Sequence, residues 1–394
     1  MEAIELLLEQ VKWVHWWIET TIMATVTPEQ AHWYPPGTLV NSFTLHRAPY
    51  CRKSSWSRHR YLSSALLAEL KFSTTGKIQK RKTKTHDILQ KVLSETYRRP
   101  IAIFPRFHHY GWGDSEFIPL LFGLAPGDVP YAEAWLGAHK VAPSSAMLSG
   151  EEQPLDQLIA SNPEDLLGHA CQSGFGELPY LVKLLSAAQP LSIQVHPSKS
   201  EAIAGYRRES AAMIPLNSAR RNYRDSNSKP EILIALTPFW ALAGFRPAAE
   251  IATAIKGIRS LARLLPPFDS KPDWLERLVA VYFGLSESVL VPALTEWVEM
   301  LADSSDTFGQ HTWEFWALRC HRLFQRDGRP DRGVFFVPLL NLIRLERWQA
   351  LFLDPGTPHA YLLGSGIEVM ANSDNVLRGG LTPKHVDVDE FLRS

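Results

Sequence analysis

The segment LSIQVHP (191–197) places polar side chains at every second residue of a strand-like run. Successive side chains of a strand point to opposite faces, so Ser192, Gln194 and His196 are expected to share one face. The amide oxygen of Gln194 and an imidazole nitrogen of His196 are both potential metal ligands. The same spacing also occurs in ordinary hydrogen-bonded polar pairs, so a metal site needs further ligands.

Two more side chains of the right type lie where strands are expected to begin. Glu231 opens the run EILIAL, and His359 follows a Pro/Gly turn in PGTPHAY. Zinc accepts imidazole nitrogens and a carboxylate oxygen, with an amide oxygen as a weaker fourth ligand. Two histidines, one glutamate and one glutamine fit that chemistry. Spacing alone does not single them out among the 14 histidines of the chain.

Four long runs occur in an order that resembles the type I mannose-6-phosphate isomerase family. They are YAEAWLGAHKVAPS (131–144), LPYLVKLLSAAQPLSIQVHPSKSEA (178–202), NYRDSNSKPEILIALTPFWALAGFRP (222–247) and GTPHAYLLGSGIEVMANSDNVLRGGLTPKHVDV (356–388). The segment FHHYGWG (107–113) is similar to the family's first strand more loosely. Ordered matches of this length are far more specific than a short motif.

The resemblance implies a zinc enzyme of cupin architecture. The family's QVH, KPE and PHAY motifs imply four ligands for one zinc ion per chain, namely Gln194, His196, Glu231 and His359. The DNVxR motif implies Arg378 as the catalytic arginine. The positions implied to bind the substrate or its phosphate are Lys183, Ser192, Lys229, Tyr361, Asp374 and Lys384.

Simpler structural roles are open for several of these residues. Arg378 follows Asp374 by four residues, so the two side chains could simply pair with each other on a surface turn, with no role in catalysis. Lys183 and Lys229 could be surface lysines with their stems on apolar surface. Tyr361 could serve strand packing alone, because aromatic residues suit strands.

The implied reaction is the interconversion of D-mannose 6-phosphate and D-fructose 6-phosphate, which feeds GDP-mannose biosynthesis. The open-chain sugar must lose its C2 proton, pass through an enediol and regain a proton at C1. Zinc can act as a Lewis acid on the sugar oxygens, and Arg378 supplies a fixed positive charge beside them. The group that moves the proton needs a pKa near the working pH. The sequence does not identify it.

Two other functions compete with the isomerase. One is a truncated, weakly active or non-catalytic cupin that binds a phosphosugar. The other is an iron-dependent cupin oxygenase that uses His196, Glu231 and His359 as a facial triad. The lysines and the Arg378 motif argue against the oxygenase.

The elements that position these residues are mainly β, with an α-helical insertion. From Ile101 onward, short β-rich runs alternate with turns, as expected for a cupin-type β-barrel or jelly roll. Helical spacing replaces them over about residues 247–330. We therefore expect an N-terminal extension with a helix and a basic linker (1–99), the first part of a catalytic cupin domain (100–246), a helical insertion domain (247–332) and the second part of the cupin domain (333–394).

The chain departs from the family pattern in two local places. Ser228 stands where many bacterial members have a histidine, which removes an imidazole near Glu231 that could relay protons. Arg347 and Trp348 stand where the family usually has a Pro-Gly turn. A bulky residue at a position needing positive φ would be strained, so the geometry of this turn is expected to differ.

Two larger departures concern the ends. Residues 1–99 have no counterpart in the family, and the chain stops at Ser394, where members usually continue into a second, cupin-like barrel. Loss of that barrel would expose apolar surface and unpaired strand edges. We therefore expect the chain, expressed alone, to be poorly soluble or weakly active.

Composition limits the class of protein. Hydrophobic residues make up 45% and charged residues 21%, as in ordinary soluble proteins. The net charge is zero, but residues 1–99 carry +7 and the remainder −7. An acidic larger part disfavours nucleic acid as a partner. We expect a phosphosugar substrate, no nucleic-acid partner and a monomer.

The N-terminal stretch and the cysteines bear on location. Residues 1–26 suit one apolar-faced helix but include four glutamates and no basic leader, so we expect neither a signal peptide nor a membrane span. Cys51, Cys171 and Cys320 are odd in number and far apart, as expected of free thiols in the cytoplasm.

Overall fold

The computed structural model describes residues 39–40 and 100–393. The predicted N-terminal helix and basic linker lie outside these residues. The strands are β1 (Leu39–Val40), β2 (Ala102–Phe104), β3 (Arg106–His108), β4 (Glu133–Leu136), β5 (Ser145–Leu148), β6 (Glu151–Pro154), β7 (Tyr180–Ala187), β8 (Ile193–Val195), β9 (Glu231–Ala235), β10 (Phe239–Phe245), β11 (Leu340–Leu345), β12 (Ala350–Leu353), β13 (His359–Ala371) and β14 (Leu377–Gly380).

The helices fall into three groups along the chain. The first includes α4 (Phe117–Leu121), α5 (Leu155–Ser161), α6 (Pro163–Gly174) and α7 (Lys199–Ala211). The second includes α8 (Ala248–Gly257), α9 (Arg259–Ala262), α10 (Trp274–Gly284), α11 (Glu287–Asp303), α12 (Trp313–Phe324) and the 3-10 helices η2 (Ser305–Thr307) and η3 (Arg332–Leu339). The last helix is α13 (Val388–Phe391). The predicted class, mainly β with an α-helical insertion, is confirmed.

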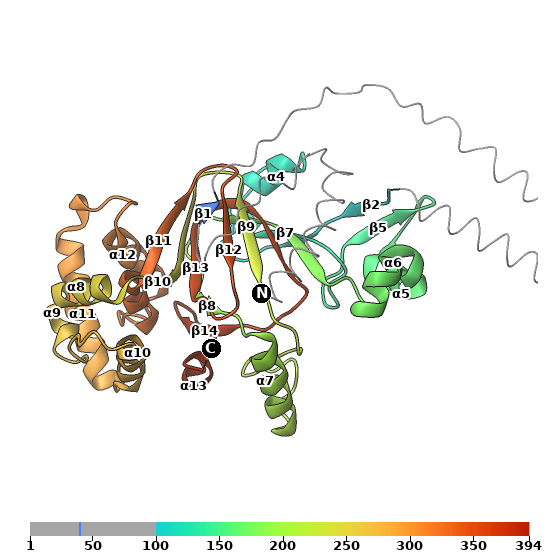
Figure 1. The fold of residues 1–394 in the computed structure, drawn as a ribbon. Helices are drawn as coiled ribbons and strands as arrows, with labels where there is room; N and C mark the ends of the chain where they lie inside the picture. The colour runs from blue at the N-terminus through green and yellow to red at the C-terminus, as the bar shows by residue number, and fades with distance from the viewer. Residues whose placement is uncertain (1–38, 41–99, 394) are drawn as a thin grey trace, which may run out of the picture.

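Antiparallel strands form a barrel-like sheet at the centre of the molecule (Figure 1). The main path runs β1-β12-β9-β13-β7-β4-β3, while β10 and β8 pair with the first part of β13, and β11 and β14 extend from them. Its interior is an apolar cluster that includes Leu233, Phe239 and Leu351. The strand-like runs LSIQVHP and EILIAL lie in this sheet as β8 and β9.

Strand β13 is the shared element of the barrel. Its first residues pair with β10, and from Gly364 onward it pairs with β7 and then β9. Gly364 has φ +126°, and a Cβ there would lie 2.7 Å from the Pro238 carbonyl oxygen, so only glycine fits this bend. The chain continues through Gly364 as one strand, His359–Ala371, because glycine allows the bend without ending the pairing.

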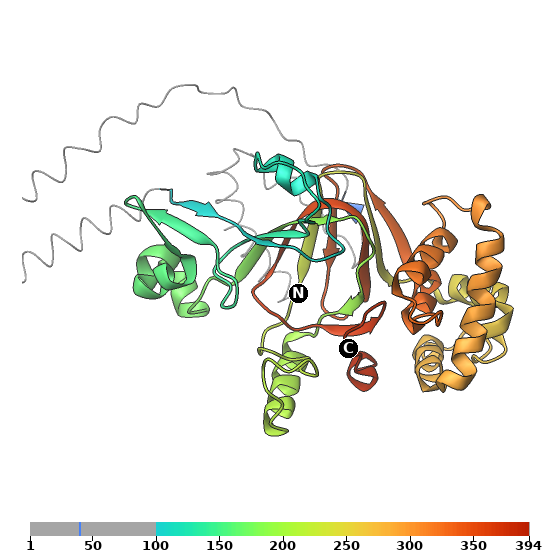
Figure 2. The same cartoon turned by 180° about the vertical axis from the view of Figure 1, so that it is seen from behind.

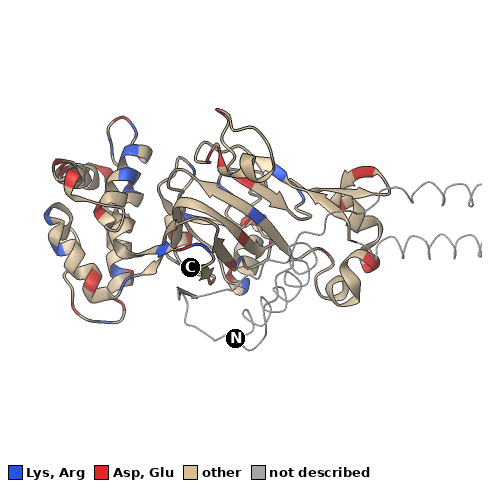
Figure 3. Cartoon of the chain, turned by 90° about the horizontal axis from the view of Figure 1, so that it is seen from above, with Lys and Arg blue, Asp and Glu red and all other residues tan. Residues whose placement is uncertain are grey.

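Helices cover two sides of the barrel. Helices α8 to α12 gather on the β10–β11 side, and α5 and α6 pack beside the small sheet β2-β5-β6 on the other (Figures 1 and 2). The helices α8 to α12 bury Trp274, Trp297 and Trp316 in a core that continues into β8, β10 and β14. Acidic and basic residues are interspersed along the described helices and strands (Figure 3).

Helix α7 was not predicted from the sequence, although its start carries a clear signal. The Ser198 hydroxyl accepts from the Glu201 N–H at 3.3 Å, and the Glu201 carboxylate accepts from the Ser198 N–H at 2.8 Å. This reciprocal capping box satisfies two backbone donors at the helix start.

Among the described residues, no single helix is long and apolar enough to cross a membrane. One bent pair, α10 with α11, meets the criteria of length and composition only when the two helices are taken together.

The turn between β11 and β12 keeps a left-handed residue without glycine. The N–H of Gln349 donates to the Glu346 carbonyl at 2.9 Å, which closes a four-residue turn, and Trp348 has φ +74° at its third position. The sequence led us to expect altered turn geometry. Instead, Trp348 adopts the positive φ that glycine would take there, at a strain cost of about 1–3 kcal/mol.

Candidate metal and phosphosugar site

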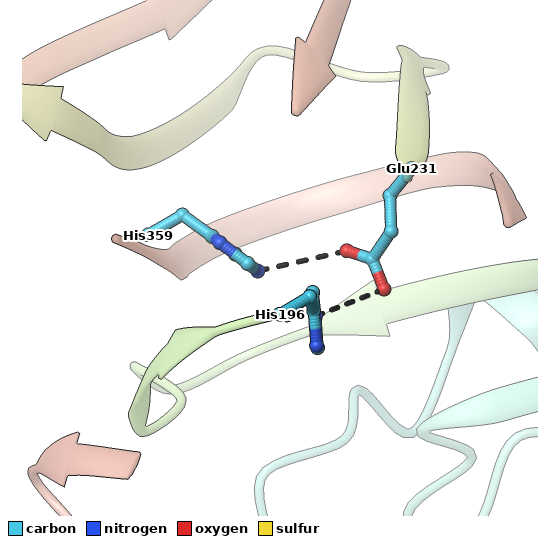
Figure 4. Close-up of side chains that lie close together, drawn as sticks. All are labelled: His196, Glu231 and His359. Carbon is cyan, nitrogen blue, oxygen red and sulfur yellow. Dashed lines mark ion pairs between the residues drawn. The ribbon is translucent and has the colours of Figure 1, made fainter. Parts of the chain in front are cut away.

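Three ends of barrel strands bring the predicted ligands together. His196 follows β8 directly, Glu231 begins β9 and His359 begins β13. The Nε2 atom of His196 lies 3.2 Å from Glu231 Oε1, and the Nε2 atom of His359 lies 3.5 Å from Oε2 (Figure 4). One donor atom from each residue lies within 4.8 Å of the other two. All three residues are at least 97% buried.

Backbone carbonyls fix the orientation of both imidazoles. His196 Nδ1 donates to the Asn375 carbonyl at 2.8 Å, and His359 Nδ1 donates to the Thr357 carbonyl at 2.9 Å. A carbonyl only accepts, so each Nδ1 carries the hydrogen of a neutral ring and each Nε2 presents a lone pair to Glu231. The same arrangement is typical of histidines that ligate metals.

The electrostatics of the triad favour the forms that bind a metal. Burial lowers the pKa of His196 to about 4, assisted by the Lys229 ammonium, and burial also lowers the pKa of His359. Burial alone would raise the pKa of Glu231, but the Lys229 ammonium outweighs it and holds that pKa well below its usual range. Two neutral imidazoles therefore face a carboxylate, as a bound cation requires.

The triad fits a metal ion because its acceptor atoms, the His196 Nε2 lone pair and the Glu231 carboxylate, face each other. His196 Nε2 is buried and has no hydrogen-bond partner among the described residues. Its lone pair faces a carboxylate oxygen, and two acceptors at 3.2 Å need a positive species between or beside them. Lys229 Nζ lies 3.0 Å from Glu231 Oε1 and supplies part of this charge. The donor set of two nitrogens and a carboxylate suits zinc.

A cavity of about 610 Å³ opens beside the triad. Glu231 and His359 line it, whereas His196 is buried and is not one of the lining residues. Gln194 also lines it, and its Cα pairs in register with those of His359 and Arg378. Gln194 is thus next to the triad, and its role as fourth ligand stays a prediction. The other predicted residues that line the cavity are Lys183, Ser192, Lys229, Tyr361, Arg378 and Lys384.

Asp374 is the predicted substrate-binding residue that lies outside the cavity lining. Its carboxylate lies 3.2 Å from His139 Nε2, and its N–H donates to the Asp225 carboxylate at 2.9 Å. It does not pair with Arg378, so the simpler interpretation of Arg378 as a surface-turn partner of Asp374 is wrong. The simpler interpretation of Lys183 and Lys229 as surface lysines is also wrong, because they are 7% and 9% exposed.

One wall of the cavity is a buried acid–base group formed by Glu133, Lys183, Tyr361 and Glu368. Lys183 Nζ lies 3.0 Å from Glu368 and 3.8 Å from Glu133, and the Tyr361 hydroxyl donates to Glu368 at 2.9 Å. Burial would lower the pKa of Lys183, but Glu133 and Glu368 raise it. Burial raises the pKa of Glu368, against the opposing effect of Lys183.

Sequence reasoning missed both carboxylates of this group. Glu133 and Glu368 lie inside apolar strand runs, YAEAWLG and GIEVMA. A lone acid among residues that favour a strand core is a usable signal, because such an acid needs a partner. The partner could not be read from the sequence, since Lys183 is in a different strand, β7.

A second wall, the cationic wall, consists of Arg326, Arg378 and Lys384. Among the described residues none of the three has a carboxylate within ion-pair distance, and Arg378 Nε is buried without a hydrogen-bond partner. Burial lowers the pKa of Lys384, as do the nearby Arg378 and Arg224. Arg326, from the segment after α12, donates to the Thr382 carbonyl at 3.3 Å. Unpaired cations that share a cavity favour an anionic ligand.

Comparisons with known proteins agree with this site. A family model described as phosphomannose isomerase type I, catalytic domain, matches residues 101–248. The mannose-6-phosphate isomerase of Escherichia coli (strain K12) is 41% identical over 286 residues, covering 72% of this chain and 71% of the relative. The Homo sapiens enzyme of the same name is 35% identical over 310 residues, covering 71% and 69%.

Solved structures give the same result for the fold. The Salmonella typhimurium mannose 6-phosphate isomerase bound to fructose 6-phosphate and zinc is 36% identical, with a TM-score of 0.65, and the match covers 74% of this chain and 73% of that one. A second structure of mannose 6-phosphate isomerase, bound to zinc, matches with the same TM-score of 0.65 and 36% identity over 75% of this chain and 74% of that one.

Proposed function

This chain belongs to the type I mannose-6-phosphate isomerase family, and we propose that it interconverts D-mannose 6-phosphate and D-fructose 6-phosphate with one zinc ion per chain. The observation that carries the proposal is the buried His196–Glu231–His359 triad in the wall of a cavity that also holds an acid–base group and unpaired cations. We propose Gln194 as the fourth ligand. When bound, zinc supplies Lewis acidity that polarises the sugar oxygens.

The chain's own residues divide the remaining work. The substrate phosphate binds to the cationic wall, where Lys384 and Arg326 have no competing carboxylate, together with Ser192, which lines the same cavity. Arg378 provides a fixed positive charge beside the negative charge that develops on the sugar oxygens as the C2 proton leaves. Lys183 and Lys229 are held by their glutamate partners, so they keep their positions without rearrangement.

Glu368 is our candidate for moving the proton. Its carboxylate lines the cavity, and burial raises its pKa toward the working pH, as a general base requires. It takes the C2 proton of the open-chain sugar to give an enediolate with the negative charge on O1. A proton then passes from the O2 hydroxyl to O1, and the same carboxyl returns its proton to C1, which leaves C2 as the ketone. Lys183 and Tyr361 hold the carboxylate during this transfer. This assignment needs no imidazole at Ser228.

The competing functions are less well supported. A binding-only cupin has no use for a buried carboxylate of raised pKa beside the ligand site, and relatives covering more than 70% of the chain bear the isomerase name. An iron oxygenase does not account for the cationic wall. We also propose that the protein acts in the cytoplasm as a monomer and supplies GDP-mannose biosynthesis, and these points rest on the family resemblance and the cysteine pattern.

The test is a coupled isomerase assay on the full chain together with metal analysis. We expect about one zinc per chain, turnover of mannose 6-phosphate, loss of turnover on chelation and recovery when zinc is restored. Bound zinc with no turnover would favour the binding-only cupin. Oxygen uptake with iron and an added substrate, in place of isomerisation, would favour the oxygenase.

A further inference from the structure

Asn375 is a buried side chain that ties two distant loops together. It lies between β13 and β14 and is 0% exposed. Its Oδ1 accepts from the backbone N–H groups of Arg224 at 2.7 Å and Asp225 at 3.2 Å. Its Nδ2 donates to the carbonyls of Asp225 and Asn227 and to the Asp225 carboxylate, at 2.9 to 3.1 Å. The whole carboxamide is therefore occupied by the loop that leads to Glu231.

Asp225, in the loop before β9, in turn forms hydrogen bonds to the loop that contains Asn375. Its carboxylate accepts from the Ser373 hydroxyl at 2.9 Å and from the Asp374 N–H at 2.9 Å. It also accepts from the Asn227 N–H at 2.8 Å within its own loop. We call this set of reciprocal bonds the Asp225–Asn375 clip. It joins the loop before β9, which contains Lys229, to the loop that leads into β14, the strand that contains Arg378.

The clip acts on the metal site through one backbone atom. The Asn375 carbonyl accepts the Nδ1 hydrogen of His196 at 2.8 Å, 179 residues away in sequence. His359 differs, because its Nδ1 donates to Thr357, only two residues before it, and needs no distant loop. The orientation of His196 thus depends on how the loop containing Asn375 is held.

We propose that the Asp225–Asn375 clip is a positioning device that fixes the Nδ1–H tautomer of His196 and aims its Nε2 at the metal position before a metal binds. The proposal rests on the zinc site proposed above. The side-chain bonds of the clip hold the loop that contains the Asn375 carbonyl. Loss of these bonds would leave the His196 ring free to rotate or to change tautomer. Partners of this kind typically change metal affinity by about 10- to 100-fold.

The experiment compares three variants of the full chain. Asn375→Ala removes the centre of the clip, and Ser373→Ala removes one hydroxyl that bonds the Asp225 carboxylate. Tyr282→Phe is the control, because it removes a buried hydrogen bond to the Arg332 carbonyl inside the helical region and touches no proposed ligand. The measurements are zinc affinity by chelator competition, thermal unfolding of the zinc-free protein, and the tautomer of His196 by ¹⁵N NMR, assigned through His196→Gln.

We expect Asn375→Ala to weaken zinc binding by about 10- to 100-fold and to populate the Nε2–H tautomer, with Ser373→Ala intermediate. Tyr282→Phe should lower the unfolding temperature and leave zinc affinity unchanged. Wild-type zinc affinity and an unchanged tautomer in Asn375→Ala would overturn the proposal, even if its stability fell. Should Asn375→Ala fail to fold, unchanged affinity and tautomer in Ser373→Ala would overturn it. If the wild-type chain bound no zinc, the proposed function would fail, while the tautomer in the zinc-free protein would still test the clip.

Discussion

The two walls of the cavity differ in whether their charged side chains are paired with a side chain of opposite charge. In the acid–base group, Lys183 and Glu368 are almost fully buried and each has a partner within about 3 Å. In the cationic wall, the described structure gives Arg326, Arg378 and Lys384 no carboxylate partner. Buried charges must be paired to be tolerated, whereas unpaired cations are tolerated where an anion or solvent can reach them. We therefore propose that the first wall is arranged for proton transfer and the second for binding a phosphate.

Among the variants that distinguish the acid–base group from the cationic wall, Glu368→Gln is expected to have the largest effect, a loss of kcat. Loss of a general base typically lowers kcat by about 10²- to 10⁴-fold. The change also breaks a buried ion pair, so the free energy of unfolding should fall by about 3 kcal/mol. Steady-state kinetics and denaturant unfolding measure the two effects. Tyr361→Phe, which keeps both charges and removes one hydrogen bond to Glu368, should lose less activity. Turnover within a few-fold of wild type in Glu368→Gln would remove Glu368 from the proton transfer.

Lys384→Ala should affect binding and spare stability. A charge-assisted hydrogen bond to phosphate contributes about 1.5–3 kcal/mol, so KM for mannose 6-phosphate should rise by about 10- to 100-fold. Stability should be unchanged or slightly higher, because Lys384 lies near Arg378 and Arg224. Inhibition by inorganic phosphate gives an independent readout. A large loss of stability with unchanged KM would contradict the division of the cavity into two walls.

The zinc-free protein should lose stability in acid through the metal end of the cavity. The folded-state pKa of His196 is about 4, below the ordinary value of 6.5, so unfolding takes up a proton between these values. Its contribution is complete above about pH 6.5 and is lost as pH falls toward 4, by up to about 1.4 kcal/mol per pH unit. Denaturant unfolding at pH 7, 6 and 5 measures the slope. An equally steep slope in His196→Gln would assign the effect to other groups.

Arg326→Ala should give the smallest effect. Its side chain is exposed at the cavity mouth, where solvent and salt screen its charge. An exposed charge contributes about 0.2–1 kcal/mol, so KM should rise by no more than about 5-fold, and less at high ionic strength. A salt series of KM values checks this. A rise as large as that of Lys384→Ala would place the phosphate closer to the helical side of the cavity.

Sequence patterns predicted the proposed metal ligands of the site. They predicted few of the residues that hold those ligands in place. The period of two in LSIQVHP placed Gln194 and His196, and the family motifs added Glu231 and His359. The partners of these residues could not be predicted, because they depend on contacts between distant strands and loops. Glu368 meets Lys183 only through the pairing of β13 with β7, and Asn375 meets His196 across 179 residues.

The fold shows the same limit. The mainly β class and the helical insertion followed from periodicity, whereas the continuity of β13 followed from a glycine bend inside the sheet. Trp348 was recognised as a misfit at a turn, but the outcome, a retained turn with a strained residue, depended on the pairing of β12 with β9. Local patterns fix element types, and the tertiary pairing decides how the elements join.

The central claim is that the buried His–Glu–His triad holds the zinc on which isomerisation depends. The most direct measurement is zinc content together with mannose-6-phosphate turnover for the wild-type chain and His359→Ala, with Tyr282→Phe as the control for stability. We predict about one zinc per wild-type chain, little zinc in His359→Ala, and a loss of turnover of about 10³-fold or more, as expected when several kcal/mol of transition-state stabilisation is removed. Equal zinc content and equal turnover in the two proteins would contradict the account.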